Sequence, residues 1–231
     1  MVDFTIAVKN ELKRFGADKV GVGDISMLPV DARRNMTFGI AVAVAIDPDV
    51  IRGIENGPTL EYRLAYDNLN YKLDEIVTYG AQYIQSFGYE AIAQTTSEVS
   101  RTVKEYSSAL PHKTVATRAG IGWIGKNAML VTKEYGSAVR ISAILTNASL
   151  QADQSINESN CKGCMRCKEA CPGEAITGIN WNITSERESL YDPAKCKKAA
   201  RKITKDRLNI EATLCGKCVL VCPFTQVYLK K

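Results

Sequence analysis

Several features that define common protein classes are missing from this chain of 231 residues. A membrane-spanning helix needs about 20 apolar residues in succession, but the most apolar run, Phe38–Ile46, has only nine. Residues 1–16 lack the cationic start, apolar core and small-residue cleavage site of a secretory signal peptide. We therefore expect a soluble, cytoplasmic protein with no membrane partner.

The chain also lacks the signatures of common nucleotide cofactors. Its glycine-dense segment, residues 120–127, has neither the G-x-G-x-x-G pattern after a strand nor the spacing of a P-loop. Binding of a nicotinamide nucleotide or of ATP is therefore not supported. Cysteine is absent before Cys161, so all eight cysteines lie in the C-terminal third of the chain.

The cysteines form two runs and one isolated residue. The first run follows the C-x2-C-x2-C-x3-C-P pattern of bacterial two-cluster ferredoxins, and the second ends in another Cys-Pro pair. In that pattern three thiolates bind one cubane, and the fourth, which precedes a helix-breaking proline, binds the other. The spacing predicts that cluster 1 is held by Cys161, Cys164, Cys167 and Cys222, and cluster 2 by Cys171, Cys196, Cys215 and Cys218.

Zinc sites and disulfides are the alternatives to iron–sulfur clusters. Zinc also binds C-x2-C pairs, and eight cysteines in a secreted chain can form four disulfides. Zinc ribbons use two pairs, however, whereas the first run here is a triple. A reducing cytoplasm disfavours disulfides. The pattern therefore favours two [4Fe-4S] clusters.

Charge is distributed unevenly along the chain. Residues 161–231 contain fourteen Lys and Arg against seven Asp and Glu, a net charge of +7, whereas residues 1–160 carry about −2. Many of the cations fall on a predicted helix in the range 195–207. This helix is either a solvated face that offsets the negative clusters, or a docking surface for an acidic redox partner or a nucleic acid backbone.

Apolar periodicity predicts a mixed α/β region before the cysteines. Helices are expected at residues 3–15, with Asp3 as the cap, and from Pro58 to Phe87. Strands are expected at 19–25, 39–46 and 89–95, and a hairpin at 128–132 and 138–146. Residues 147–160 are polar and suggest a linker. The predicted fold class is therefore α+β or α/β: an N-terminal mixed α/β reductase-like domain, residues 1–150, and a bacterial-ferredoxin-like two-[4Fe-4S] domain, residues 151–231.

A short helix ending at Gly120 is followed by the glycine-dense segment. Its glycines suit a backbone that approaches a flat or anionic group closely, and Trp123 and Lys126 lie among them. This segment and the cysteine order resemble the epoxyqueuosine reductase family of double-cluster [4Fe-4S] proteins. The resemblance implies that two clusters deliver electrons to a cobalamin on the N-terminal domain, and that the substrate is a modified base in tRNA. The corrinoid-binding residues that it implies are Gly120, Gly122, Trp123, Gly125, Lys126 and Gly216.

The chain departs from the family pattern at three points. Tyr106 occupies the position of the aspartate proton donor, and Gly216 and Lys217 replace aspartates after the cysteine that matches Cys215. The helical repeats that help family members hold tRNA do not follow, so we expect a short form. Tyr106 is the candidate catalytic proton donor. His112, the only histidine, is either a structural residue, a second proton donor or a cofactor contact.

Two functions of different classes follow from these features. The first is an iron–sulfur oxidoreductase whose clusters pass single electrons to an N-terminal site holding cobalamin, with an unknown substrate. The second is an electron-transfer module without a substrate of its own. In either case the expected partner is a redox donor protein or another low-potential reductant. Binding of tRNA through residues 195–207 is a further alternative.

Overall fold

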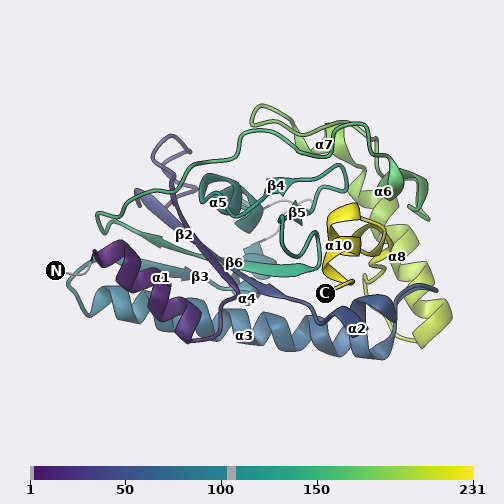
Figure 1. Cartoon of the computed structure of the whole chain (residues 1–231), viewed down its shortest axis with the longest axis horizontal. Helices are drawn as coiled ribbons and strands as arrows, with labels where there is room; N and C mark the ends of the chain where they lie inside the picture. Colours follow the sequence, from purple (N-terminus) through teal and green to yellow (C-terminus); the bar gives the residue numbers. More distant parts are fainter. Residues whose placement is uncertain (1–2, 103–107) are drawn as a thin grey trace. The chain divides into compact units, whose positions relative to one another are not determined.

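The computed structural model describes residues 3–102 and 108–231 (Figure 1). The chain divides into two compact units whose segments alternate along the sequence. Unit 1 consists of Met1–Val44, Leu69–Gly122 and Arg140–Ile156. Unit 2 consists of Ala45–Asn68, Trp123–Val139 and Asn157–Lys231.

Unit 1 is built on a four-stranded sheet with the strand order β1-β2-β6-β3. Strands β1 (Lys19–Asp24) and β2 (Phe38–Ala45) pair antiparallel. Strands β3 (Ala91–Gln94) and β6 (Val139–Thr146) also pair antiparallel. The predicted strands at 19–25, 39–46 and 89–95 are confirmed to within two residues at each end.

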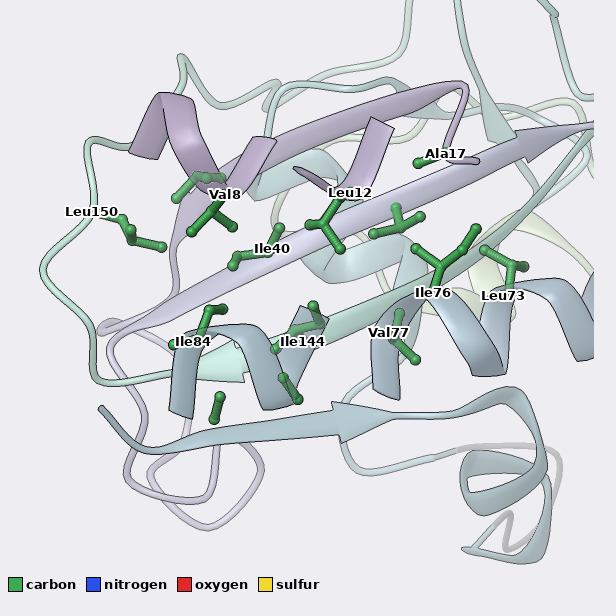
Figure 2. Packing of buried hydrophobic residues seen from close by; sticks show 14 of the residues in the cluster. Val8, Leu12, Ala17, Ile40, Leu73, Ile76, Val77, Ile84, Ile144 and Leu150 are labelled. Atoms are coloured by element: carbon green, nitrogen blue, oxygen red, sulfur yellow. The ribbon is translucent and has the colours of Figure 1, made fainter. Parts of the chain in front are cut away.

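Helices α1 (Phe4–Arg14) and α3 (Leu60–Gln85) supply much of the apolar core of unit 1. The Asp3 side chain caps α1 by accepting a hydrogen bond from the Thr5 backbone N–H, as its position before the apolar pattern predicts. Figure 2 shows Leu12 of α1, Ile76 of α3 and Ile144 of β6 within one buried cluster. Burial of such side chains contributes about 1.5–3 kcal/mol each, so this core is the main stabilising feature of the unit.

The opposite face of β1 is packed against helix α5 (His112–Arg118). Alternation along the strand points Val22 into the core, and Gly21 and Gly23 toward α5. A Cβ atom on Gly21 would lie 2.2 Å from the Ala119 carbonyl oxygen, so only glycine allows this approach. Helix α4 (Thr96–Thr102) follows β3 in the same unit.

Unit 2 contains mostly short elements. Besides the first part of α3, up to Asn68, they are helix α2 (Pro48–Arg52), strands β4 (Trp123–Ile124) and β5 (Leu130–Val131), and helices α6 (Arg166–Glu169), α7 (Arg187–Leu190), α8 (Pro193–Leu208), α9 (Lys217–Leu220) and α10 (Pro223–Tyr228). Strand β5 pairs with β4, and β6 pairs with β3. The predicted hairpin of residues 128–132 with 138–146 is therefore wrong, because each of its strands finds a different partner.

The two units also differ from the predicted domains, residues 1–150 and 151–231. Residues 45–68 and 123–139 group with the cysteine-containing segment. The reason is long-range packing: Trp123 packs on Phe224, and Gly136 lies against Thr225. Residues 147–160 are not a free linker either, because Ala148 and Leu150 belong to the buried cluster of unit 1.

Within the described residues, none of the helices combines the length and the apolar character that crossing a membrane requires.

Candidate metal centres

The first cysteine run folds as a tight loop followed by a single helical turn. The Cys164 backbone N–H donates to the Cys161 carbonyl at 3.1 Å, and Lys162 has a positive φ of 49°. Cys167 lies in α6, and the Cys171 N–H donates to the Lys168 carbonyl at 3.2 Å just after this helix ends. The loop therefore groups three thiols and separates the fourth from them.

Four thiols share one small cavity in unit 2. The residues that line it are Cys161, Cys164, Cys167, Cys222, Lys126, Asn127, Val131 and Pro223. The pKa of the Cys167 thiol is raised to about 11, first by burial and then by the thiols of Cys161, Cys164 and Cys222. The structure thus brings together the four cysteines that the spacing assigns to cluster 1.

The other four cysteines form a second group. The pKa of the Cys196 thiol is raised by burial and then by the thiols of Cys171 and Cys215. The pKa of the Cys218 thiol is likewise raised by burial and then by the thiols of Cys215 and Cys196. These are the four cysteines that the spacing assigns to cluster 2.

The two groups lie beside each other within unit 2. Cys167, of the first group, is one of the thiols that raise the pKa of Cys218. Cys171 is positioned by an N–H···S hydrogen bond of 3.4 Å from the Ala175 backbone. Neighbouring groups of four thiols are the arrangement found in two-cluster ferredoxins.

The donor chemistry of both groups fits an iron–sulfur cluster. All eight cysteines are free thiols, and burial disfavours the thiolate form unless a cation compensates it. Ligated metal supplies that charge and deprotonates the thiol. Among the residues that the structure describes, no three His, Cys, Asp or Glu side chains are placed to bind a single metal ion.

The predicted corrinoid-binding residues Trp123, Gly125 and Lys126 are all buried in unit 2. Trp123 is 2% exposed and packs edge-on against Phe224, with ring centroids 4.9 Å apart. A Cβ atom on Gly125 would lie 2.7 Å from Asn127 Oδ1. Lys126 is 3% exposed and lines the cluster 1 cavity. In this geometry none of the three offers an exposed surface to a planar ligand.

The other glycines of that prediction are constrained by neighbouring protein atoms. Gly120, in unit 1, has a φ of 66°, and a Cβ atom there would lie 2.5 Å from the Gln154 carbonyl oxygen. Gly216, in unit 2, has a φ of 80°, and its Cβ atom would lie 2.4 Å from Ile54 Cδ1. Gly122 is buried in unit 1. Close packing of the chain accounts for Gly120 and Gly216, and their corrinoid contact stays a prediction.

Asn127 is a cavity residue to which sequence reasoning assigned no role. Its Nδ2 donates to Ser137 Oγ at 3.1 Å and to the Cys218 carbonyl at 3.4 Å, and its Oδ1 accepts from the Met129 N–H at 3.1 Å. Asn127 therefore ties the β4–β5 turn to the segment carrying the second cysteine run. In the sequence, Asn127 is marked only by its position directly after Lys126. That position does not predict a hydrogen bond to Cys218, which lies far along the chain.

The structure describes only one of the two candidate proton donors, His112. Tyr106 lies outside the described residues. His112 begins α5, and burial lowers the pKa of its imidazole, as does the nearby Arg140, whereas the Gln94 and Ile141 carbonyls and Asp74 act in the opposite direction. Its Nε2 atom is buried without a hydrogen-bond partner in the described chain. This histidine is therefore a neutral imidazole at pH 7.

The basic stretch forms helix α8, which begins with an Asp192 cap and carries Cys196 in its first turn. Several of its cations are exposed, namely Lys195, Lys198, Arg201, Lys202, Lys205 and Arg207. Two have local partners: Lys202 pairs with Asp206 at 2.7 Å, and Lys205 lies 3.9 Å from Glu211. The helix thus presents positive charge to solvent next to the second cysteine group.

Comparison with known proteins identifies the class of the cysteine-containing segment. Residues 160–225 match the family described as a 4Fe-4S double cluster binding domain. The chain therefore carries a double-cluster [4Fe-4S] domain, and the prediction of two such clusters is confirmed at that level.

Curated proteins of similar sequence are epoxyqueuosine reductases. The chain is 29% identical over 137 residues to an epoxyqueuosine reductase of Lactococcus garvieae, a match covering 59% of this chain and 38% of the relative. It is 34% identical over 120 residues to that of Synechocystis sp., covering 51% of this chain and 40% of the relative. The chain is thus epoxyqueuosine reductase-like, as the sequence motifs predicted, although the matches span well under half of these relatives.

Solved structures show the same fold. An epoxyqueuosine reductase of Streptococcus thermophilus has a TM-score of 0.63 at 20% identity, covering 96% of this chain and 66% of that one. A second, with an epoxyqueuosine-modified tRNA-Tyr stem loop, has a TM-score of 0.62 at 20% identity, covering 96% and 65%. A reductive dehalogenase described in terms of B12-dependent dehalogenation has a TM-score of 0.68 at 18% identity, covering 94% and 31%. The predicted fold class, mixed α/β with a C-terminal double-cluster domain, is confirmed.

Proposed function

We propose that this protein is an iron–sulfur oxidoreductase in which two [4Fe-4S] clusters pass single electrons to a site on the N-terminal part of the chain. The observation that carries the proposal is the grouping of thiols: Cys161, Cys164, Cys167 and Cys222, from both cysteine runs, line one cavity. Because the ligands of cluster 1 come from both runs, the two runs must fold together around it.

The second cluster is assigned to Cys171, Cys196, Cys215 and Cys218. The mutual effects of these thiols on one another's pKa values support this set. A cubane with four cysteine ligands has no free iron position for organic chemistry and serves to carry electrons. Two adjacent cubanes therefore form a short path for electrons and not an active site. Such a path requires an electron acceptor elsewhere.

The ligand assignment is tested by metal content after anaerobic purification. We expect about eight iron and eight sulfide per chain. Cys196→Ala should lose about half of the iron and the EPR signal of cluster 2 only, and Cys222→Ala the other half and the signal of cluster 1 only. Zinc in place of iron, or a Cys196→Ala protein with both EPR signals intact, would contradict the assignment.

A corrinoid is the acceptor that we propose for these electrons. Support comes from the resemblance to epoxyqueuosine reductases and from the fold shared with a reductive dehalogenase described as B12-dependent. When bound, a corrinoid supplies a centre at which an organic substrate is reduced. The contacts that we propose are Gly120, Gly122 and Gly216. Trp123, Gly125 and Lys126 are buried, so we do not propose them as direct contacts.

This chain's own contribution to the chemistry would be a proton. A tyrosine with the unperturbed pKa near ~10 keeps its proton at neutral pH until a reduced substrate takes it, and Tyr106 is the donor that we propose. His112 is the second candidate, and its buried, unpartnered Nε2 is the atom that could hold a proton. Cobalamin titration separates binding from chemistry: Tyr106→Phe should leave the corrin spectral change intact and slow turnover only.

An electron-transfer module without its own substrate is the second candidate function. The exposed cations of α8, next to the second cysteine group, favour it, because they suit an acidic redox partner. A relative in the solved structures holds a tRNA stem loop, so the same helix is also a candidate for contact with an RNA backbone. No corrin spectral change at high cobalamin concentration, in protein with both clusters intact, would favour the module.

A further inference from the structure

Lys126 is the only charged residue buried within the described chain, with 3% of its surface exposed. It lies in the turn after β4 and lines the cavity that the four cluster 1 thiols share. An ammonium group in such a place loses its hydration, which is costly unless an opposite charge replaces the lost water.

No carboxylate of the described residues supplies that charge. Among the described residues, the Lys126 Nζ atom has one hydrogen-bond partner, Met165 Sδ at 3.7 Å. A thioether sulfur is only a weak acceptor and carries no formal charge. The protein part of this cavity therefore contains a cation without a counter-anion.

An iron–sulfur cluster would be that anion. A cubane with four thiolate ligands carries a net charge of about −2 when oxidised and about −3 when reduced, and its potential depends on nearby charge and solvent exposure. Attraction to a cation is stronger for the more negative state. In a buried site with little water this attraction is screened much less than at the surface.

We propose that Lys126 is the counter-cation of cluster 1 and raises its reduction potential. The inference rests on the proposed ligand set and assigns Lys126 to the cluster instead of a corrinoid. Cluster 2 lacks an equivalent in the described residues, because the cations near it are at least partly exposed: those of α8, and Lys217, whose Nζ donates to the Glu55 carbonyl. The effect should therefore be confined to cluster 1.

Lys126→Met tests the proposal because methionine keeps an unbranched, flexible side chain, one heavy atom shorter than that of lysine, and removes its charge. Lys162→Met is the matched control, since Lys162 follows Cys161 directly but its side chain is exposed. Both variants and the wild-type protein are titrated under redox control with EPR detection of each cluster. At the wild-type midpoint of cluster 1, we expect the reduced-to-oxidised ratio in Lys126→Met to fall about tenfold, a shift of about 59 mV for one electron. Cluster 2 and the Lys162→Met protein should shift much less.

Two results would overturn the inference: an unchanged cluster 1 midpoint in Lys126→Met with full iron content, or equal shifts of cluster 1 in both variants. If Lys126→Met fails to assemble cluster 1, Lys126→Arg decides. Retention of cluster 1 in Lys126→Arg supports a need for positive charge, whereas its loss there too would mean that shape and not charge matters. A wild-type protein without iron would refute the proposed function itself, which the metal analysis detects separately.

Discussion

Unit 1 and unit 2 differ in the length of their elements and in their cysteine content. Unit 1 has a four-stranded sheet and a continuous apolar cluster that includes Leu12, Ile40, Ile76 and Ile144. Unit 2 has strands of two residues and several helices of only four residues, connected by loops that converge on the cysteines. Such short elements are unstable alone. We therefore infer that metal ligation adds to the stability that unit 2 gains from buried side chains such as Ile54 and Trp123.

Removal of iron should therefore produce the largest difference in stability between the two units. Structural metal sites contribute roughly 10 kcal/mol or more to the folding of small metal-binding domains. After anaerobic chelation of the clusters, we expect backbone amides of α6 and α9 to lose most of their protection against hydrogen exchange, and those of β2 to keep theirs. Hydrogen exchange with mass spectrometry measures both. Equal loss of protection in β2 and α9 would show that the clusters stabilise both units.

A core truncation in unit 1 should give the converse result. Ile76 is fully buried in the apolar cluster, and replacing a buried isoleucine by alanine costs about 2–5 kcal/mol. We expect Ile76→Ala to lower the free energy of unfolding of unit 1 by that amount and to leave both cluster EPR signals unchanged. Ile6→Ala is the matched control, since Ile6 is 51% exposed, and it should change stability by less than about 0.5 kcal/mol. Loss of a cluster signal in Ile76→Ala would break the distinction.

The same difference explains which parts of the structure the sequence could predict. Helices α1 and α3 and strands β1 and β2 follow from apolar periodicity, and the grouping of the cysteines follows from their spacing. The pairing of β4 with β5 was missed because strands of two residues carry no periodic signal. The burial of Lys126 was also missed, because it depends on a cavity assembled from residues between 126 and 223.

Charge reversal on α8 tests whether unit 2 meets a partner through this helix. Lys198→Glu with Arg201→Glu should slow reduction by an acidic donor protein several-fold at low salt, because exposed charges steer association over a Debye length of ~8 Å at physiological salt. Reduction by dithionite should be unchanged. Stopped-flow kinetics at two salt concentrations measure the effect. The control pair is Lys13→Glu with Lys133→Glu, because both lysines are exposed and the net charge changes by the same amount. Equal slowing in the control pair would mean that net charge alone matters.

The smallest effect should come from His112, and it should appear in unit 1 alone. Burial lowers the pKa of this imidazole in the folded state, whereas the unfolded chain keeps a value near ~6.5. Below that pH the unfolded state binds more protons, so the free energy of unfolding of unit 1 should decrease as the pH falls, by at most about 1.4 kcal/mol per pH unit, until the folded-state pKa is reached. Because the chain has no other histidine, His112→Gln should abolish this dependence between pH 5.5 and 6.5. Denaturant unfolding at several pH values measures it, and a slope that persists in His112→Gln would assign the titration to another group.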